Sequence, residues 1–376
     1  MILFLLLALA APAAHPIAVS VGDGKQMLVD GAQVVPARPA PDMLSLIDLA
    51  GAPRIVAEIP VPASVIGPPS SVAVTPDGRF ALVSSARRID PADPTRIIPD
   101  DRLTMIDLES RPVSVVATLR AGAGASGIAI DPAGRHALVA NRAEGSVSLF
   151  VIDGDRLRLT DTLAIGDSAA SPAQPIFFAH GSRALVSRDG DHLLSTLRII
   201  GDRLEIEPGG ARSGLRPYGL SAAAGDPRFA IVANIGGGGH DVDTISLIDL
   251  AGPSPRVVDT VAVGLTPEGI AMAPDGRHVA VNVNAGSNGS PASPEYRNRG
   301  EVQVWRIDGI HLVRVTSAPV GRWGQGVGWT ADSRTLLVQS NVERRIDLFR
   351  FDGRRLARRG ALVTAAPPAA LAVGGR

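Results

Sequence analysis

Short apolar runs separated by polar turns recur along almost the whole chain. Residues 71–85 read SVAVTPDGRFALVSS and residues 127–141 read GIAIDPAGRHALVAN, so each stretch holds two apolar runs around a Pro/Asp/Gly turn and a basic residue. The runs are short and rich in Val, Ile and Leu, which is typical of β-strands joined by hairpin turns. Helical spacing of apolar residues is not sustained beyond the first residues of the chain. The pattern therefore predicts an all-β protein.

This turn-and-strand motif occurs seven times along the sequence. Its basic residue is in turn Lys25, Arg79, Arg135, Arg183, Arg228, Arg277 and Arg334, at spacings of about 45 to 57 residues. After each copy comes a third apolar run, at 44–49, 103–108, 147–153, 194–200, 245–250, 302–308 and 346–352, and then a fourth, alternating run. A four-stranded unit repeated at this period is typical of a propeller blade. We predict one seven-bladed β-propeller of four-stranded antiparallel blades over residues 15–376.

The two ends of the chain predict how the ring closes. Residues 367–373 read PPAALAV and repeat residues 68–74, PPSSVAV, so the chain ends on what resembles the first strand of a further unit. Propellers leave fewer exposed strand edges when one terminus completes the blade that the other begins. We predict that the C-terminal strand and the segment Ile17 to Val21 share one blade, and either could supply its inner strand.

The first residues differ from the rest of the chain. Ile2 to Ala11 reads ILFLLLALAA and is followed by small residues, the pattern of a signal-peptide core with its cleavage site. A buried strand or a lipid-facing anchor is the alternative. We predict a signal peptide at residues 1–14, a mature chain that begins between Ala11 and His15, a periplasmic or secreted location, and no membrane span after signal removal.

Composition and charge narrow the classes of partner. The chain has no cysteine, which removes disulfides and thiol chemistry, and it carries 37 basic and 37 acidic residues for a net charge of zero. Nucleic acid binding needs concentrated positive charge, so we expect no nucleic acid partner. We expect a monomer that binds a small polar or anionic ligand or another exported protein.

Recurring acidic residues suggest two roles. An Asp ends the third run in six of the seven units, at Asp48, Asp107, Asp153, Asp249, Asp308 and Asp352. These carboxylates could form a ring of metal ligands, but capping of the turn that follows each one explains all six positions.

His240, Asp241 and Asp243 form a weak metal-binding pattern on one loop. We predict no metal site and no cofactor. His136 and His278 follow the basic residue of the turn and are predicted to lie at the surface.

Two segments carry a resemblance to a known family. Leu138 to Asn141 (LVAN) and Ile231 to Asn234 (IVAN), each followed by the third apolar run, resemble the YVTN-type, WD40-like repeat of secreted β-propellers, which is similar to the seven-bladed lactonase-like proteins. The resemblance implies the fold. Lactonase-like propellers typically place a Pro-Arg-His sequence and a Glu where inner strands begin. This chain has Arg216-Pro217-Tyr218 instead, with no His in the entries to its inner strands.

Loops on one face of a propeller form the mouth of its channel, and this face usually binds ligands. The loops that enter the inner strands are lined by small residues and prolines in the first blades, whereas blades five to seven carry charged and aromatic residues. The predicted ligand-binding residues are Gln174, Arg216, Tyr218, Glu268, Arg322, Trp323 and Gln325. The long segments 86–102, 235–243 and 284–300 are expected on the same face. The alternative is a rim that only contacts water.

Two functional classes remain open at the sequence level. A noncatalytic binding or interaction module is favoured, because the entries lack the His that the resemblance implies. The alternative is a lactonase or lactonizing enzyme acting on a small sugar lactone or an unsaturated acid. In that enzyme Glu268 would be the base and Arg216 the electrophilic group.

Overall fold

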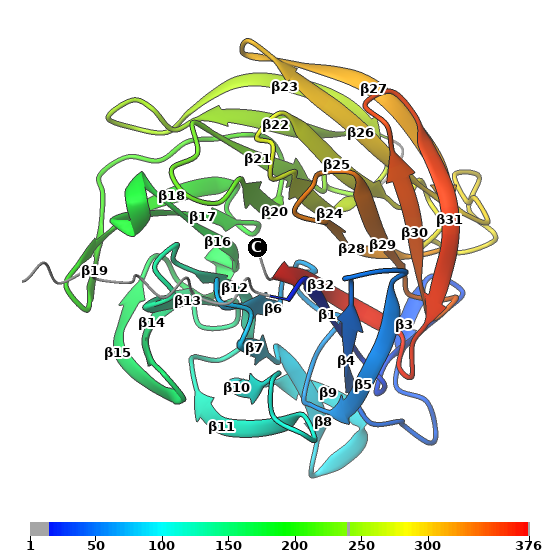
Figure 1. Ribbon diagram of the computed structural model, residues 1–376, viewed down its shortest axis with the longest axis horizontal. Helices are drawn as coiled ribbons and strands as arrows, with labels where there is room; N and C mark the ends of the chain where they lie inside the picture. Colours follow the sequence, from blue (N-terminus) through cyan, green and yellow to red (C-terminus); the bar gives the residue numbers. More distant parts are fainter. Residues whose placement is uncertain (1–14, 239–240, 375–376) are drawn as a thin grey trace, which may run out of the picture.

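The computed structural model describes residues 15–238 and 241–374, so the predicted signal peptide at residues 1–14 and His240 lie outside the described residues. Seven four-stranded antiparallel sheets are arranged in a ring around a central channel (Figure 1). Helix among the described residues is limited to the two 3-10 turns η1 (Ser168–Ala170) and η2 (Ala179–Gly181). The predicted seven-bladed β-propeller is confirmed.

The first four blades are numbered here from the one that holds the N-terminal strand, with strands given from the channel outward. Blade 1 contains β32 (Pro368–Gly374), β1 (Ile17–Gly22), β4 (Met43–Asp48) and β5 (Arg54–Pro60). Blade 2 contains β6 (Val72–Val74), β7 (Phe80–Ser84), β10 (Arg102–Asp107) and β11 (Ser114–Arg120). Blade 3 contains β12 (Ala125–Ile130), β13 (His136–Asn141), β14 (Ser146–Asp153) and β15 (Arg156–Ala164). Blade 4 contains β16 (Pro172–Phe178), β17 (Arg183–Arg188), β18 (Leu193–Ile200) and β19 (Arg203–Ile206).

The last three blades follow the same order. Blade 5 contains β20 (Pro217–Ala222), β21 (Phe229–Asn234), β22 (Asp243–Asp249) and β23 (Arg256–Gly264). Blade 6 contains β24 (Pro267–Met272), β25 (His278–Val283), β26 (Gly300–Asp308) and β27 (His311–Val320). Blade 7 contains β28 (Gly324–Trp329), β29 (Thr335–Ser340), β30 (Arg345–Phe351) and β31 (Leu356–Val363). The third strand of every blade coincides with one of the predicted third apolar runs.

Ring closure joins the two ends of the chain in blade 1. The C-terminal strand β32 pairs with β1 from Ile17, opposite Gly374, to Gly22, opposite Pro368. The prediction that the termini share a blade is confirmed, and the C-terminus supplies the inner strand while the N-terminus supplies the second.

This closure corrects one predicted copy of the repeat. The motif around Lys25 was expected to be a turn between first and second strands, followed by a blade strand. Instead β1 is already the second strand, Lys25 lies in the loop after it, and β2 (Met27–Val29) pairs with β3 (Ala32–Val34) in a small hairpin. The prediction fails because the inner strand of blade 1 comes from the other end of the chain, so this blade has no such turn.

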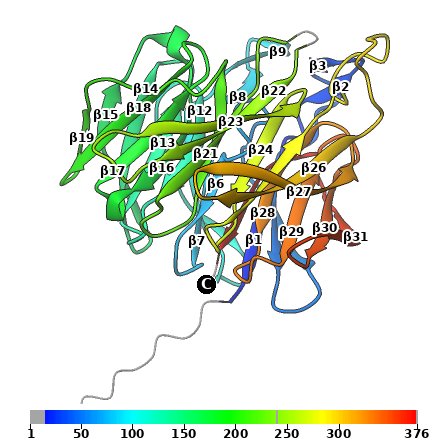
Figure 2. The ribbon, with the colours of Figure 1, turned by 90° about the horizontal axis from the view of Figure 1, so that it is seen from above.

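Two hairpins extend the face at which the inner strands begin, called here the upper face. They are β2–β3 and the pair β8 (Arg87–Asp90) with β9 (Asp93–Pro99), which forms within the predicted long segment 86–102. Figure 2 shows both hairpins on one side of the ring and the C-terminal end of the chain on the other. The upper face therefore carries additional hairpins beyond the strands of the blades.

Apolar side chains pack in layers between neighbouring blades. One layer joins Leu82 and Met105 of blade 2 to Val139 and Phe150 of blade 3, and all four side chains are fully buried. Truncating a fully buried aromatic side chain such as Phe150 to Ala typically costs about 3–5 kcal/mol. These layers hold the blades in a rigid ring, which fixes the positions of the loops at its mouth.

Most of the acidic residues of the turns cap them, as predicted. Asp77 accepts from the backbone N–H of Arg79 at 3.0 Å, and Gly78 adopts a φ of 78° that other residues resist. Four of the six third-strand carboxylates do the same for the turns that follow them, namely Asp48, Asp107, Asp249 and Asp352. Among the described residues Asp153 forms no such bond, and Asp308 accepts from Arg306 instead. The capping side chains therefore stabilise the turns of the blades.

His136 does not lie at the surface, contrary to its prediction. Its side chain is buried on the face opposite the mouth, with Nδ1 3.2 Å from an oxygen of Asp131 and Nε2 3.2 Å from Asp202 of blade 4. His278 is half-buried against the ring of Phe351. Turns that look exposed in the sequence pack against elements of the neighbouring blade.

Candidate functional site at the channel mouth

The loops that enter the inner strands of blades 5 and 6 share an unusual backbone conformation. Arg216 and Thr266 have φ values of 57° and 54°, in the left-handed region that non-glycine residues rarely adopt. The backbone N–H of Arg216 donates to Nδ1 of His192 at 3.2 Å, and that of Thr266 donates to Asp243 at 2.7 Å. His192 lies in the loop between the second and third strands of blade 4, and Asp243 begins the third strand of blade 5, so segments of the preceding blade hold each entry in place.

Glycines bring the inner strands close together just below the entries. A Cβ on Gly219 would lie 2.7 Å from the backbone oxygen of Glu268, and a Cβ on Gly269 would lie 2.1 Å from that of Gln325. Both distances are shorter than any ordinary contact, so only glycine allows this approach. Tyr218, Glu268 and Gln325 thereby occupy equivalent positions on three neighbouring strands.

Glu268 is the central ionisable group of this arrangement. Its carboxylate accepts from Nε2 of Gln325 at 2.8 Å and from Nδ2 of Asn284 at 3.1 Å. Burial raises the pKa of Glu268 to about 7, although the hydrogen bonds from Gln325, Asn284 and Trp323 favour the charged form. A carboxyl group with this pKa can accept and return a proton near neutral pH.

Two arginines converge on one carboxylate beside Glu268. Asp189, at the end of β17, is buried and accepts from Nη2 of Arg142 at 2.7 Å and from Nη2 of Arg216 at 3.4 Å. The guanidinium carbon of Arg142 lies 5.4 Å from the ring centroid of Tyr218, a cation–π contact. Burial raises the pKa of Tyr218, which keeps its hydroxyl protonated. The two guanidinium groups carry one positive charge more than the carboxylate of Asp189 neutralises.

Several buried polar atoms at the mouth have no protein partner. Ten such side-chain atoms occur in the described part of the chain, and six of them lie at the upper end of the channel: Ser70 Oγ, Ser126 Oγ, Arg142 Nη1, Gln174 Oε1, Asn284 Oδ1 and Gln325 Oε1. A buried group without a partner typically costs about 1–3 kcal/mol. Asn284 and Gln325 contact Glu268, and Ser70 and Gln174 line the same cavity as Glu268. This is the pattern expected where a ligand or water completes the hydrogen bonding.

A cavity of about 320 Å³ lies below this cluster in the channel. Ser70, Gln174 and Glu268 line its upper end, and inner-strand residues such as Val72 and Ile270 line the rest. This volume is within the range of small-molecule sites, which combine an apolar wall with a few convergent polar groups. The carboxylate of Glu268 therefore faces a space of suitable size.

The predicted site residues separate into two groups. Arg216, Tyr218, Glu268 and Gln325 come together in the cluster, and Gln174 lies at the rim of the cavity, where its Nε2 donates to the backbone oxygen of Pro175 at 3.0 Å. Arg322 is engaged elsewhere, whereas Trp323 is buried beside the cluster and hydrogen-bonds Glu268. The Nε of Arg322 donates to Glu343 at 2.9 Å, and Trp323 is only 3 % exposed, packed against Val65 and Ala369.

Four residues of the cluster were not among the predictions. Arg142, Asp189 and Asn284 follow the second strands of blades 3, 4 and 6, and His192 lies in the loop after Asp189. The sequence signal was available, because the residue after each second strand reaches the same ring of positions as the entry residues. The predicted ligand-binding residues all belong to the entries, so these positions were missed.

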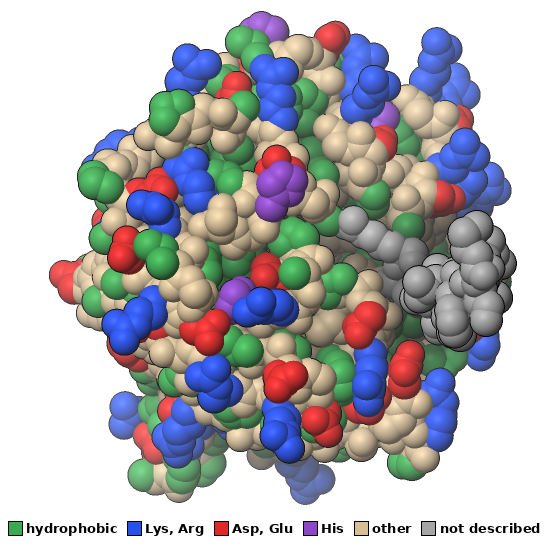
Figure 3. Space-filling model, turned by 60° about the vertical axis from the view of Figure 1, so that its left-hand side comes forward, with side chains coloured by type: hydrophobic (Ala, Val, Ile, Leu, Met, Phe, Trp, Pro, Cys, Tyr) green, Lys and Arg blue, Asp and Glu red, His purple; other side chains and the backbone are tan. Residues whose placement is uncertain are grey.

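Two features are absent from the described residues. No group of three or more His, Cys, Asp or Glu side chains in residues 15–238 and 241–374 is placed to hold a metal ion. Within the same residues, no helix has the length and hydropathy needed to cross a membrane. Acidic and basic side chains are interspersed over the face seen in Figure 3, in line with the zero net charge.

The fold and its mouth define a seven-bladed propeller with a polar cluster at one end of the channel, and solved structures share this architecture. A Bacteroides uniformis protein provisionally named 6-phosphogluconolactonase is 15 % identical, with a TM-score of 0.71 over 96 % of this chain and 99 % of that one. The periplasmic gluconolactonase PpgL of Pseudomonas aeruginosa is 16 % identical, with a TM-score of 0.67 over 96 % and 99 % of the two chains. A Desulfotomaculum acetoxidans protein of unknown function is 16 % identical, with a TM-score of 0.69 over 96 % and 99 %.

Identity this low establishes the fold alone. No protein-family model matches the chain, and no curated protein matches it. The YVTN-type repeat therefore stays a prediction, while the likeness to lactonase-like propellers holds at the level of the fold.

Proposed function

We propose that the channel mouth binds a small lactone and hydrolyses it, with Glu268 as the general base. The observation that carries the proposal is a carboxyl group with a pKa of about 7, surrounded by unpaired buried polar atoms and facing a cavity of about 320 Å³. Structural neighbours named gluconolactonase support a lactone as the substrate class.

The cluster suggests a role for each group in the reaction. Glu268, in its charged form, takes a proton from a water molecule as that water attacks the carbonyl carbon of the lactone. The oxyanion that forms accepts from the unpaired Nη1 of Arg142. The ring C–O bond then breaks, Glu268 returns the proton to the departing ring oxygen, and the product is a hydroxy acid.

A noncatalytic binding module is the second candidate, and one observation favours it. Both oxygens of Glu268 already accept hydrogen bonds, from Gln325 and from Asn284. In that case Arg142 and Arg216 would hold an anionic ligand without any proton transfer.

Turnover of a lactone panel that includes glucono-δ-lactone, followed by acid release, separates the two candidates. For the enzyme, turnover falls at least about 100-fold in Glu268→Gln, the usual contribution of a general base, while the protein stays folded. Saturable binding without turnover, weakened by Arg142→Gln, would instead support the module. If neither turnover nor binding is detected with any lactone or sugar acid, the mouth is not the site.

We also propose that the protein is exported. The support is the signal-like pattern of residues 2–11 and the periplasmic location named for one structural neighbour. N-terminal sequencing of the protein from its native host should find a mature end between Ala11 and His15. A soluble cytosolic protein that retains Met1 would contradict this.

A further inference from the structure

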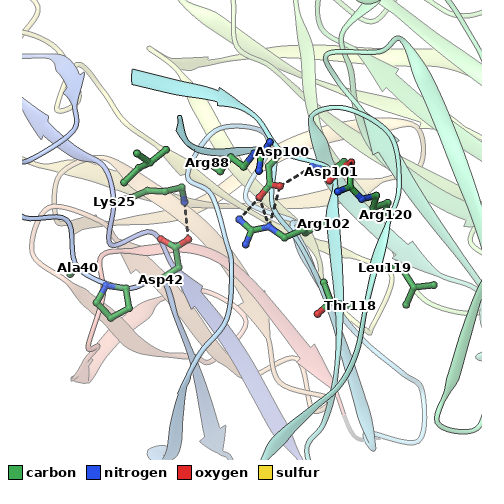
Figure 4. A pocket seen from close by; sticks show the side chains of 12 residues that line it. Lys25, Ala40, Asp42, Arg88, Asp100, Asp101, Arg102, Thr118, Leu119 and Arg120 are labelled. Carbon is green, nitrogen blue, oxygen red and sulfur yellow. Dashed lines mark hydrogen bonds and ion pairs between the residues drawn. The ribbon is translucent and has the colours of Figure 1, made fainter. Parts of the chain in front are cut away.

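A second cavity, of about 590 Å³, lies on the upper face between blades 1 and 2, away from the mouth cluster (Figure 4). Three arginines line it from three different elements: Arg88 from β8, Arg102 from the start of β10 and Arg120 from the end of β11. None of its lining residues belongs to the cluster around Glu268.

Two of these arginines are directly opposed in the sheet. Arg102 and Arg120 are register partners in the β10–β11 ladder. Like charges directly opposite each other on antiparallel strands are unfavourable. Asp100 and Asp101 compensate one arginine each, with Arg102 Nε 2.8 Å from Asp100 and Arg120 Nη1 3.0 Å from Asp101. The two carboxylates thus hold a pair of guanidinium groups that would otherwise move apart.

The compensation leaves donors available in the cavity. Arg102 uses Nε and Nη2 toward Asp100, and Arg120 uses Nη1 toward Asp101, so neither guanidinium has all its N–H groups engaged by the described residues. Arg88 is exposed and forms no side-chain hydrogen bond or ion pair with the described residues. Three guanidinium groups face Asp100 and Asp101, and the Lys25–Asp42 ion pair in the lining adds no net charge, so one positive charge is in excess among the lining residues.

Lys25, which also lines the cavity, does not add to this excess. It is the only lysine of the chain and is 6 % exposed. Its Nζ lies 2.9 Å from Asp42 and 3.2 Å from Asp23, and it donates to the backbone oxygen of Ala63. The charge of Lys25 is thus compensated by its own carboxylates, and Lys25 belongs to the wall of the cavity.

We propose that this cavity binds an oxyanion, the phosphoryl or carboxylate group of a small molecule, through Arg88, Arg102 and Arg120. The guanidinium group is the side chain best suited to such oxygens, because its planar N–H donors match them in pairs. The β8–β9 hairpin, an insertion within blade 2, supplies Arg88 to the site. The inference does not depend on lactone hydrolysis at the mouth.

Isothermal titration calorimetry of the full-length protein with inorganic phosphate, and separately with citrate, tests the proposal. We expect saturable binding of at least one anion, weaker at high ionic strength because the contacts are charged. Arg88→Gln and Arg120→Gln should each raise the dissociation constant about tenfold, the usual effect of losing one charged hydrogen bond. The control Arg277→Gln, an exposed arginine at the opposite face, should leave it unchanged.

The two probes also identify the chemistry. Binding of phosphate alone points to a phosphoryl ligand, and binding of citrate alone points to a carboxylate. The proposal is overturned if neither anion binds, or if binding survives both Arg88→Gln and Arg120→Gln. It is equally overturned if Arg142→Gln at the mouth abolishes binding while Arg88→Gln does not. Unchanged melting temperatures of Arg88→Gln and Arg120→Gln would show that their effect is on the site.

Discussion

The surroundings of Glu268 determine its pKa and its hydrogen bonding. An isolated glutamate has a pKa of 4.5, whereas burial in the channel wall raises the pKa of Glu268 to about 7. The amides of Gln325 and Asn284 donate to its charged form. Their unpaired oxygens could accept from its protonated form after rotation of either amide. The site can therefore stabilise both protonation states.

Stability should depend on pH through Glu268. A carboxyl group whose pKa is higher in the folded state binds more protons there than in the unfolded state, so stability falls as pH rises. The loss should extend from about pH 4.5 to about pH 7, on the order of 1–3 kcal/mol. Chemical denaturation of the wild type and of Glu268→Gln across this range checks it. An identical pH profile for the two proteins would contradict the raised pKa.

Arg216 and Trp323 are predicted site residues that differ in how far their side chains are exposed. Trp323 is 3 % exposed and packs on Val65 and Ala369, whereas the Arg216 side chain is 41 % exposed. We expect Trp323→Ala to lower the free energy of unfolding by about 3–5 kcal/mol. Arg216→Ala should change it by less than about 1 kcal/mol. Urea denaturation of both variants measures their free energies of unfolding. An equal loss of stability in the two variants would mean that Arg216 has a structural role.

At the scale of elements, the loops of the upper face are tied together by buried charge. Asp23, which is fully buried, accepts from the backbone N–H of Gln26 and of Val65, while Asp42 accepts from that of Ala63. Lys25 lies between the two carboxylates. One ion cluster thereby joins the loop after β1 to the segments before β4 and after β5.

Removing Lys25 should damage this connection. Lys25→Met leaves two buried carboxylates without their cation, and breaking a buried ion pair typically costs about 3–5 kcal/mol. We expect a clear fall in melting temperature, measured by differential scanning calorimetry. Arg277→Gln, at an exposed turn, is the control and should melt as the wild type does. A Lys25→Met variant with the melting temperature of the wild type would show that the cluster contributes little.

At the scale of the whole molecule, the ring depends on its last strand. Leu371 and Ala370 of β32 are buried, and β32 packs between β1 and the inner strand of blade 7. Without this strand, blade 1 would expose the edge of β1 to the channel and the ring would be open.

Deleting Leu371 to Arg376 should therefore destabilise the protein by at least about 3 kcal/mol, the scale of losing one buried leucine with its surroundings. Thermal unfolding followed by circular dichroism measures the effect. Removal of only Gly375 and Arg376 is the control. If the longer deletion melts at the parent temperature, β32 does not hold the ring closed.

The architecture could be predicted from the sequence because its signals are local. Runs such as LSLIDL at 44–49 and ISLIDL at 245–250 alternate with turn residues, and each blade repeats the pattern within about 57 residues. The shared blade of the termini was also predictable, because residues 367–373 repeat the first strand of a unit. The copy at Lys25 was misassigned, because the local pattern cannot show that its partner strand lies at the other end of the chain.

The site was determined by tertiary structure. Entry residues such as Glu268 could be found from their position in the repeat, but Arg142, Asp189 and Asn284 join them only when five blades close around one channel. Burial, which sets the pKa of Glu268 and hides Trp323, depends on how closely neighbouring strands approach. Strand order and turn type follow from residues near one another in the chain, whereas charge, desolvation and hydrogen bonding at the mouth depend on residues that only the ring brings together.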